Sequence, residues 1–115
     1  MASEFSSSNL IADRYASALY DLSSNSNIID KVLSDLLVLN ELIKNNKNLK
    51  LLIKSPLISS IEKLKIFNKL IEKNSSNNLT LNFLKVIAKN KRFVNLPLII
   101  DKFQKINSQK RGDVI

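Results

Sequence analysis

Hydrophobic residues recur at spacings of three and four along almost the whole chain, which is the pattern of helices that bury one face. Polar clusters divide this pattern into segments, and Gly and Pro are scarce. The segments predict helices over residues 9–23, 28–44, 47–53, 61–73, 79–90 and 96–109. We therefore expect an all-α fold, a six-helix bundle, with no strand before Gly112 and a mobile polar loop over residues 74–78.

Local signals indicate where several of these helices begin and end. Ser8 or Asn9 is expected to cap the first helix. The third helix should end before Ser55, because the following proline moves that residue out of the α region. Ser59 stands three residues before Glu62, which is the spacing of a capping box at the start of the fourth helix.

The helical spacing also predicts which side chains face the core. In the second and fourth helices these residues are Ile29, Val32, Leu36, Leu39 and Ile43, and Ile61, Leu64, Phe67, Leu70 and Ile71.

The first and fifth predicted helices are apolar over a wider arc than a surface helix needs. The first helix carries two adjoining stripes, one of Ile11, Tyr15, Ala18 and Leu22 and one of Ala12, Ala16, Leu19 and Tyr20. The wide arc of the fifth helix consists of Leu79, Leu81, Phe83, Leu84, Val86, Ile87 and Ala88. Two interpretations remain open. The surplus faces form a groove that accepts an amphipathic helix, or both helices are central and covered by neighbours.

Composition excludes several classes of chemistry. A chain of 115 residues with 44% hydrophobic residues is long enough for one domain with its own core. It has no Cys and no His, which excludes disulfides, cysteine nucleophiles and thiolate or imidazole metal sites. The ten acidic residues are dispersed along polar faces, and the single Gly112 makes no phosphate-binding loop. We therefore expect no catalytic residue, no metal site and no cofactor.

The formal net charge of +8 permits binding to nucleic acid, to an anionic membrane or to an acidic protein. The lysines are spaced along helices rather than gathered in a run, which is typical of solvated helix faces. Arginine occurs only at Arg14, Arg92 and Arg111, which weakens a nucleic-acid interpretation. A small basic all-α RNA-binding factor of the antitermination type remains the alternative function, and peripheral binding to anionic lipid is a third. No signal peptide and no membrane-spanning run is expected.

Four sequence motifs follow one another in an order that is specific when they are taken together. They are the stretch RYASALYDL from Arg14 to Leu22, Ser55-Pro56 followed by Lys63, the stretch NFLKVIAKNKRF from Asn82 to Phe93, and Gly112 with Val114. In order and spacing this chain resembles the delta subunit family of bacterial F-type ATP synthases, whose mitochondrial member is the oligomycin sensitivity-conferring protein. The resemblance covers about residues 9–115.

The resemblance implies a six-helix N-terminal domain over residues 9–111, after a flexible segment 1–8 and before the start of a second domain at 112–115. It implies a non-catalytic stator subunit that resists rotary torque during proton-driven ATP synthesis. The domain would bind the N-terminal helices of the alpha subunits between its first and fifth helices, and the missing C-terminal domain would meet the b-type stalk subunits. The expected location is peripheral, on the cytoplasmic side of the bacterial inner membrane, without nucleic acid and without membrane insertion.

Carried over by position, the family's contact surface gives six partner-binding residues. They are Tyr15, Ala18 and Leu22 of the first helix and Asn82, Val86 and Lys89 of the fifth. Among them, Ala18 would let a partner backbone approach, Val86 would supply an apolar floor, and Asn82 and Lys89 would meet polar groups at the rim.

The chain departs from the family after the fifth helix, where members usually read Asn-Gly-Arg and this chain reads Asn90-Lys91-Arg92. Glycine adopts the left-handed conformation readily. We expect Asn90 to take that conformation instead, or the turn to shift by one residue.

Overall fold

The computed structural model describes residues 2–72 and 77–110, with side chains from residue 9 onward. In these residues the protein is all-α, with six α-helices, one 3₁₀ turn and no strand, which confirms the predicted fold class. The helices are α1 (Ala2–Asn25), α2 (Ile29–Asn45), α3 (Lys47–Lys54), α4 (Ser60–Glu72), α5 (Asn78–Lys89) and α6 (Leu96–Lys110), with η1 (Phe93–Asn95) before α6. Part of the predicted loop 74–78 and the expected domain start at 112–115 lie outside the described residues.

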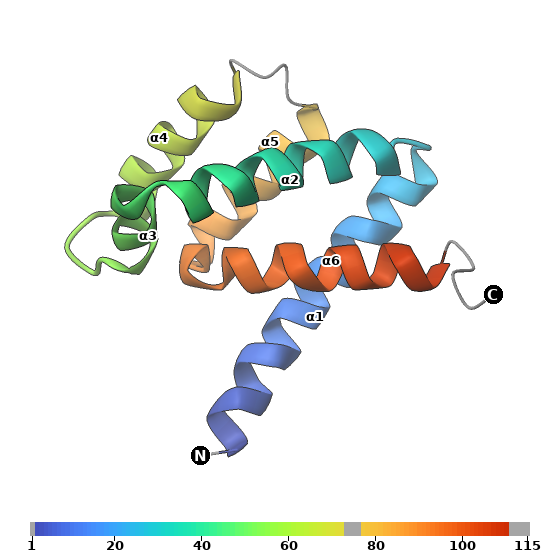
Figure 1. Ribbon diagram of the computed structural model, residues 1–115, viewed down its shortest axis with the longest axis horizontal. Coiled ribbons are helices and arrows are strands. Elements are labelled where there is room, and N and C mark those ends of the chain that lie inside the picture. Colours follow the sequence, from blue (N-terminus) through green and yellow to red (C-terminus); the bar gives the residue numbers. More distant parts are fainter. Residues whose placement is uncertain (1, 73–76, 111–115) are drawn as a thin grey trace.

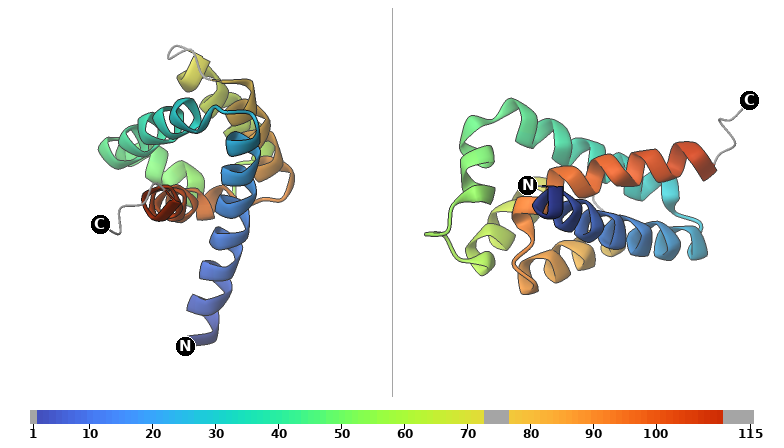
Figure 2. Two further views of the ribbon diagram at one scale, coloured as in Figure 1. Left: turned by 90° about the vertical axis from the view of Figure 1, so that its right-hand side faces the viewer. Right: turned by 90° about the horizontal axis from the view of Figure 1, so that it is seen from below.

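The helices pack around one core rather than in parallel rows (Figure 1). α1 packs along α6, α4 packs against α5, and α2 lies across the bundle in contact with α6, α3 and α5. The N-terminal half of α1 projects beyond the other helices, as Figure 1 and the left view of Figure 2 show. This arrangement leaves part of α1 and part of α5 without a covering helix.

Two pairs of aromatic rings, one stacked and one tilted, connect elements within the core. Phe67 of α4 lies parallel to Phe93 of η1 with ring centroids 5.3 Å apart, and Tyr20 of α1 meets Phe103 of α6 at 5.5 Å. The two phenylalanines that stack and Phe103 are almost inaccessible to solvent. Rings at these separations add about 1 kcal/mol each to the burial of their surface. The short turn η1 is therefore held in the core by its aromatic residue.

Most of the predicted inward positions are confirmed, but Ile61 is wrong because its side chain is 67% exposed. Phe67 and Ile71 set the inward direction of α4, and at 3.6 residues per turn Ile61 lies roughly 100° away from it. Lys63 occupies the inward face instead and is only 9% exposed. The sequence pattern gave no indication of this buried lysine.

The helix ends agree with the sequence except at the beginning of the chain. Helices α2 to α6 begin and end within one residue of the predicted ranges. α1 begins at Ala2, so the cap expected at Ser8 or Asn9 is wrong, because no Gly or Pro interrupts residues 2–8. The helix therefore includes most of the segment expected to be a flexible N-terminus.

The capping box of α4 is confirmed. The backbone N–H of Glu62 donates to Ser59 Oγ at 3.2 Å, and the backbone N–H of Ser59 donates to Glu62 Oε1 at 3.4 Å. These two bonds satisfy N–H groups that have no partner within the helix. They also fix the point at which the chain enters α4 after the loop that follows α3.

Candidate functional site

The two apolar stripes of α1 have different surroundings. Ala12, Ala16, Leu19 and Tyr20 are buried in the core. The other stripe faces α5, and its residue Leu22 remains 54% exposed. Val86 on α5 is 46% exposed, so neighbouring helices do not cover these faces. The structure therefore favours the interpretation of a groove.

This groove, here called the α1–α5 groove, encloses about 320 Å³ between the two helices. Its lining is mainly apolar with polar side chains among it, and comprises Arg14, Tyr15, Ala18, Leu19, Leu22, Leu79, Asn82, Phe83, Val86 and Asn90. The lining residues recur at intervals of three and four on each helix, because each helix turns one face to the groove. Such a surface fits the apolar face of a helix.

Five of the six sequence-predicted contact residues line the groove: Tyr15, Ala18, Leu22, Asn82 and Val86. Lys89 does not. It is exposed at the last position of α5 and lines a different hollow, beside the loop between α3 and α4. The structure thus brings five of these residues together and places the sixth outside the groove.

Two lining residues, one from α1 and one at the C-cap of α5, are joined by a contact that the sequence did not predict. Asn90 Nδ2 donates a hydrogen bond to Tyr15 Oη at 2.8 Å, and the Tyr15 ring meets Phe83 edge-on with centroids 6.4 Å apart. Arg14 and Asn90 line the groove although neither was predicted. Their spacing was the available signal, since they stand four residues from Ala18 and Val86 respectively.

Asp35 of α2 holds the N-terminal end of α5 in place. Its Oδ2 accepts a hydrogen bond from the backbone N–H of Asn77 and another from Thr80 Oγ1, both at 2.8 Å. Asp35 and Thr80 are both buried, so the bond between them is shielded from water, and the bond from Asn77 is partly shielded. A carboxylate at the first turn of α5 also matches the positive end of the helix dipole. Asp35 therefore helps to fix the wall of the groove.

The C-terminal end of α5 is fixed by its backbone. The N–H of Arg92 donates to the carbonyl of Ile87 at 2.8 Å, and the N–H of Lys91 donates to the carbonyl of Ala88 at 3.0 Å. This is a Schellman motif, in which the residue after the C-cap is left-handed. Lys91 takes that conformation with φ 57°, while Asn90 has φ −92°, so the expectation for Asn90 is wrong. The two backbone bonds, rather than side-chain preference, decide the position of the turn.

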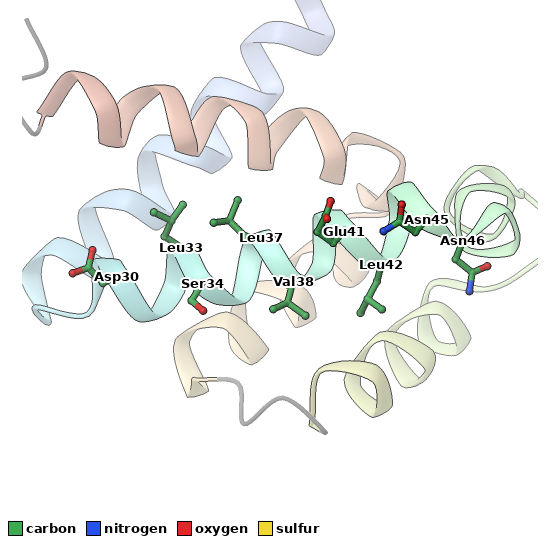
Figure 3. A pocket seen from close by; sticks show the side chains of 9 residues that line it. All are labelled: Asp30, Leu33, Ser34, Leu37, Val38, Glu41, Leu42, Asn45 and Asn46. Atoms are coloured by element: carbon green, nitrogen blue, oxygen red, sulfur yellow. The ribbon is translucent and has the colours of Figure 1, made fainter.

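A second apolar surface lies on the outer face of α2 (Figure 3). Leu33 and Leu37 point toward α6, whereas Val38 and Leu42 point to the other side of the helix. These side chains diverge, with the exposed Glu41 among them, so they build no common floor. The α1–α5 groove, where two helices converge, is the better candidate site.

The described residues contain no cluster of three or more His, Cys, Asp or Glu side chains that could hold a metal ion. Among the same residues, no helix is both long and apolar enough to cross a membrane.

The fold and the groove define an all-α domain with an open surface between two helices. A family model described as "ATP synthase delta (OSCP) subunit" matches residues 11–115. The ATP synthase subunit delta of Rhizobium meliloti (strain 1021) is 38% identical over 104 residues, which cover 90% of this chain and 55% of that protein. The subunit delta of Mesorhizobium japonicum is 34% identical over 113 residues, covering 98% of this chain and 61% of that protein.

The chain therefore belongs to the ATP synthase delta (OSCP) subunit family, as the sequence motifs indicated. It spans little more than half the length of these curated relatives.

Proposed function

We propose that this chain acts in an F-type ATP synthase as a non-catalytic stator component. In this proposal the α1–α5 groove binds the N-terminal helices of the alpha subunits and so connects the catalytic head to the peripheral stalk. The connection resists rotary torque during proton-driven ATP synthesis. The observation that carries the proposal is the open apolar groove between α1 and α5, together with family membership.

The groove supports a helical partner by the chemistry of its lining. Leu22 and Val86 are about half exposed and offer apolar surface that a docked helix would cover. Ala18, exposed and small, leaves room for the partner backbone between them. Arg14 and Asn82 are exposed polar residues of the lining, which can meet polar groups of the partner. An apolar floor with a polar rim is the usual composition of a protein interface.

The contact with b-type stalk subunits is assigned in this proposal to the part of the relatives that this chain does not cover, since the matched residues are 55% of the first relative. The protein would then work at the periphery of the membrane, on its cytoplasmic side in a bacterium, as part of the complex. Family membership gives no support to the alternative of an RNA-binding factor.

Calorimetry tests the proposal directly. The chain is titrated with a peptide of an alpha-subunit N-terminus and, separately, with a soluble b-type stalk dimer and with single-stranded RNA. We expect binding to the peptide and none to the stalk dimer or the RNA. A peptide whose apolar positions are replaced by serine is the matched control and should not bind. Tight binding to the stalk dimer would reassign the interfaces, and absence of binding to the native peptide would refute the groove as the alpha-subunit site.

A further inference from the structure

A second concave surface, here called the basic hollow, lies at the end of the bundle where the loop between α3 and α4 meets the C-terminal end of α5 and η1. It encloses about 760 Å³. Its basic lining residues are Lys54, Lys63, Lys89 and Lys91, and no Asp or Glu is among the lining residues. Four lysines thus line one hollow, and the nearby carboxylate of Glu62 is hydrogen-bonded to Ser59 of the lining rather than paired with any of them.

The basic hollow also has an apolar floor and rim. Ile53, Ala88 and Phe93 form buried parts of the lining. Ile61 and Val94 stand at the rim with 67% and 56% of their side chains exposed. Solvated lysine faces alone would not need these apolar neighbours. The combination of exposed apolar side chains and unbalanced charge is typical of an interaction surface.

Lys63 gives an independent reason to expect an anionic ligand. The residue is 9% exposed, and its Nζ donates one hydrogen bond, to the carbonyl oxygen of Ile53 at 3.3 Å. An ammonium group has three N–H donors, and a buried charge is costly unless it is paired. The ion pairs found among the described residues involve Lys102 and Lys105, not this lysine. A carboxylate in the hollow would supply the missing negative charge.

Lys54 and Lys89 have a structural role as well, since each is the last residue of its helix and complements the negative end of the helix dipole. Lys63 donates to the carbonyl of Ile53 in the last turn of α3, and Lys91 directly follows the C-cap of α5. The helix ends therefore account for part of the positive charge, but they supply no negatively charged partner for these lysines.

We propose that the basic hollow binds an acidic protein segment that carries apolar side chains. Inorganic phosphate has no apolar surface and would leave the exposed side chains of Ile61 and Val94 at the rim in contact with water, so it is a poorer match than a protein segment. No arginine lines the hollow, and its one aromatic ring, that of Phe93, is 2% exposed, so neither base recognition nor stacking is available. A concave surface also fits an inserted side chain better than a flat bilayer.

This site is separate from the α1–α5 groove. Ala88, which lines the hollow, and Val86, which lines the groove, lie roughly 200° apart around α5 at 3.6 residues per turn. A segment in the hollow would leave the groove accessible. The proposal therefore stands or falls independently of the proposed function.

Nuclear magnetic resonance titration of the ¹⁵N-labelled chain tests the proposal with a short synthetic peptide of alternating glutamate and leucine. We expect amide shifts around Lys54, Lys91 and Val94 and none around Val86. The double variant Lys54→Gln/Lys91→Gln should weaken binding at least about tenfold, as loss of charge pairs at a protein interface does.

The matched control is Lys31→Gln/Lys44→Gln, which removes two exposed lysines of α2 and should change the affinity less than about threefold. Lys63→Met tests the buried ammonium, with the unfolding transition of each variant recorded to establish that it is folded. The proposal is refuted if the peptide produces no shifts at the hollow, or if both double variants weaken binding equally. It is also refuted if inorganic phosphate, RNA or phosphatidylglycerol vesicles produce the same shifts with equal or higher affinity than the peptide.

Discussion

Replacement of Val86 by aspartate should abolish binding of an alpha-subunit peptide while the domain stays folded. In the free protein the side chain is 46% exposed, so an aspartate there remains in contact with water. When a partner helix covers the groove, the same carboxylate loses that water among a mainly apolar lining, in which Arg14 is the one cationic residue. The substitution therefore destabilises the complex with the partner helix far more than it destabilises the free, folded domain.

The magnitude can be worked from the exposure of Val86. Full burial of a valine side chain contributes about 1.5–3 kcal/mol, and the half that is still exposed therefore contributes about 1 kcal/mol on docking. Aspartate forfeits this contribution and adds the penalty of an unpaired buried carboxylate, which is at least about 1 kcal/mol. The sum is about 2 kcal/mol or more, which corresponds to about a thirtyfold rise in the dissociation constant.

Two matched variants separate binding from folding. Ile87→Asp places the same charge one residue further along α5, at a fully buried position, and should unfold the domain. Val94→Asp places it at a position that is 56% exposed and outside the groove, and should leave peptide binding unchanged. Calorimetry gives the affinities and circular dichroism the helicity. If Val86→Asp unfolds the protein as Ile87→Asp does, or binds the peptide as tightly as the wild type, the assignment of the groove floor is refuted.

Three further variants test the groove and its supports. Ala18→Phe should fill the groove and weaken peptide binding at least tenfold without loss of helicity. Ser17→Phe, on the adjacent exposed face, should leave peptide binding unchanged. If calorimetry shows the same loss of affinity for both variants, a steric role of position 18 is contradicted. Asp35→Ala removes the acceptor of one buried and one partly buried hydrogen bond and should lower the free energy of unfolding by about 2–4 kcal/mol in urea denaturation, against less than about 0.5 kcal/mol for the exposed Glu41→Ala. Lys91→Gly should raise the free energy of unfolding by about 1 kcal/mol, because φ is 57° at this position; a loss of stability would show that the lysine side chain compensates for its conformation.

Much of the fold was predictable because its helices bury narrow, regular faces and have few competing signals. The ends of α2 to α6 follow from polar clusters, one proline and a capping box, and these are local features of the sequence. The stripes of α1 alone left two interpretations open, a groove or a central helix covered by neighbours, and only the family resemblance pointed to the groove.

Tertiary placement was not foreseeable in the same way. Lys63 faces inward because its ammonium group donates to the carbonyl of Ile53 at the end of α3. The spacing of hydrophobic residues in the sequence carries no information about such a hydrogen-bond partner. Asn90 pairs with Tyr15 across 75 positions of sequence, and the basic hollow joins two segments that are distant in the chain, 53–63 and 88–94. Lys89 was assigned to the groove rim from family position, but the rotation of α5 turns it toward the hollow.

The restraint of α5 at both ends has a thermodynamic consequence for recognition. Asp35 holds its first turn, and the Schellman motif with the Asn90–Tyr15 bond holds its last. A wall fixed in this way enters a complex already in its bound geometry, so that the loss of conformational entropy on association falls on the incoming segment alone. Loosening either end would then reduce affinity through increased motion of the free domain, even where every side chain that touches the partner is unchanged.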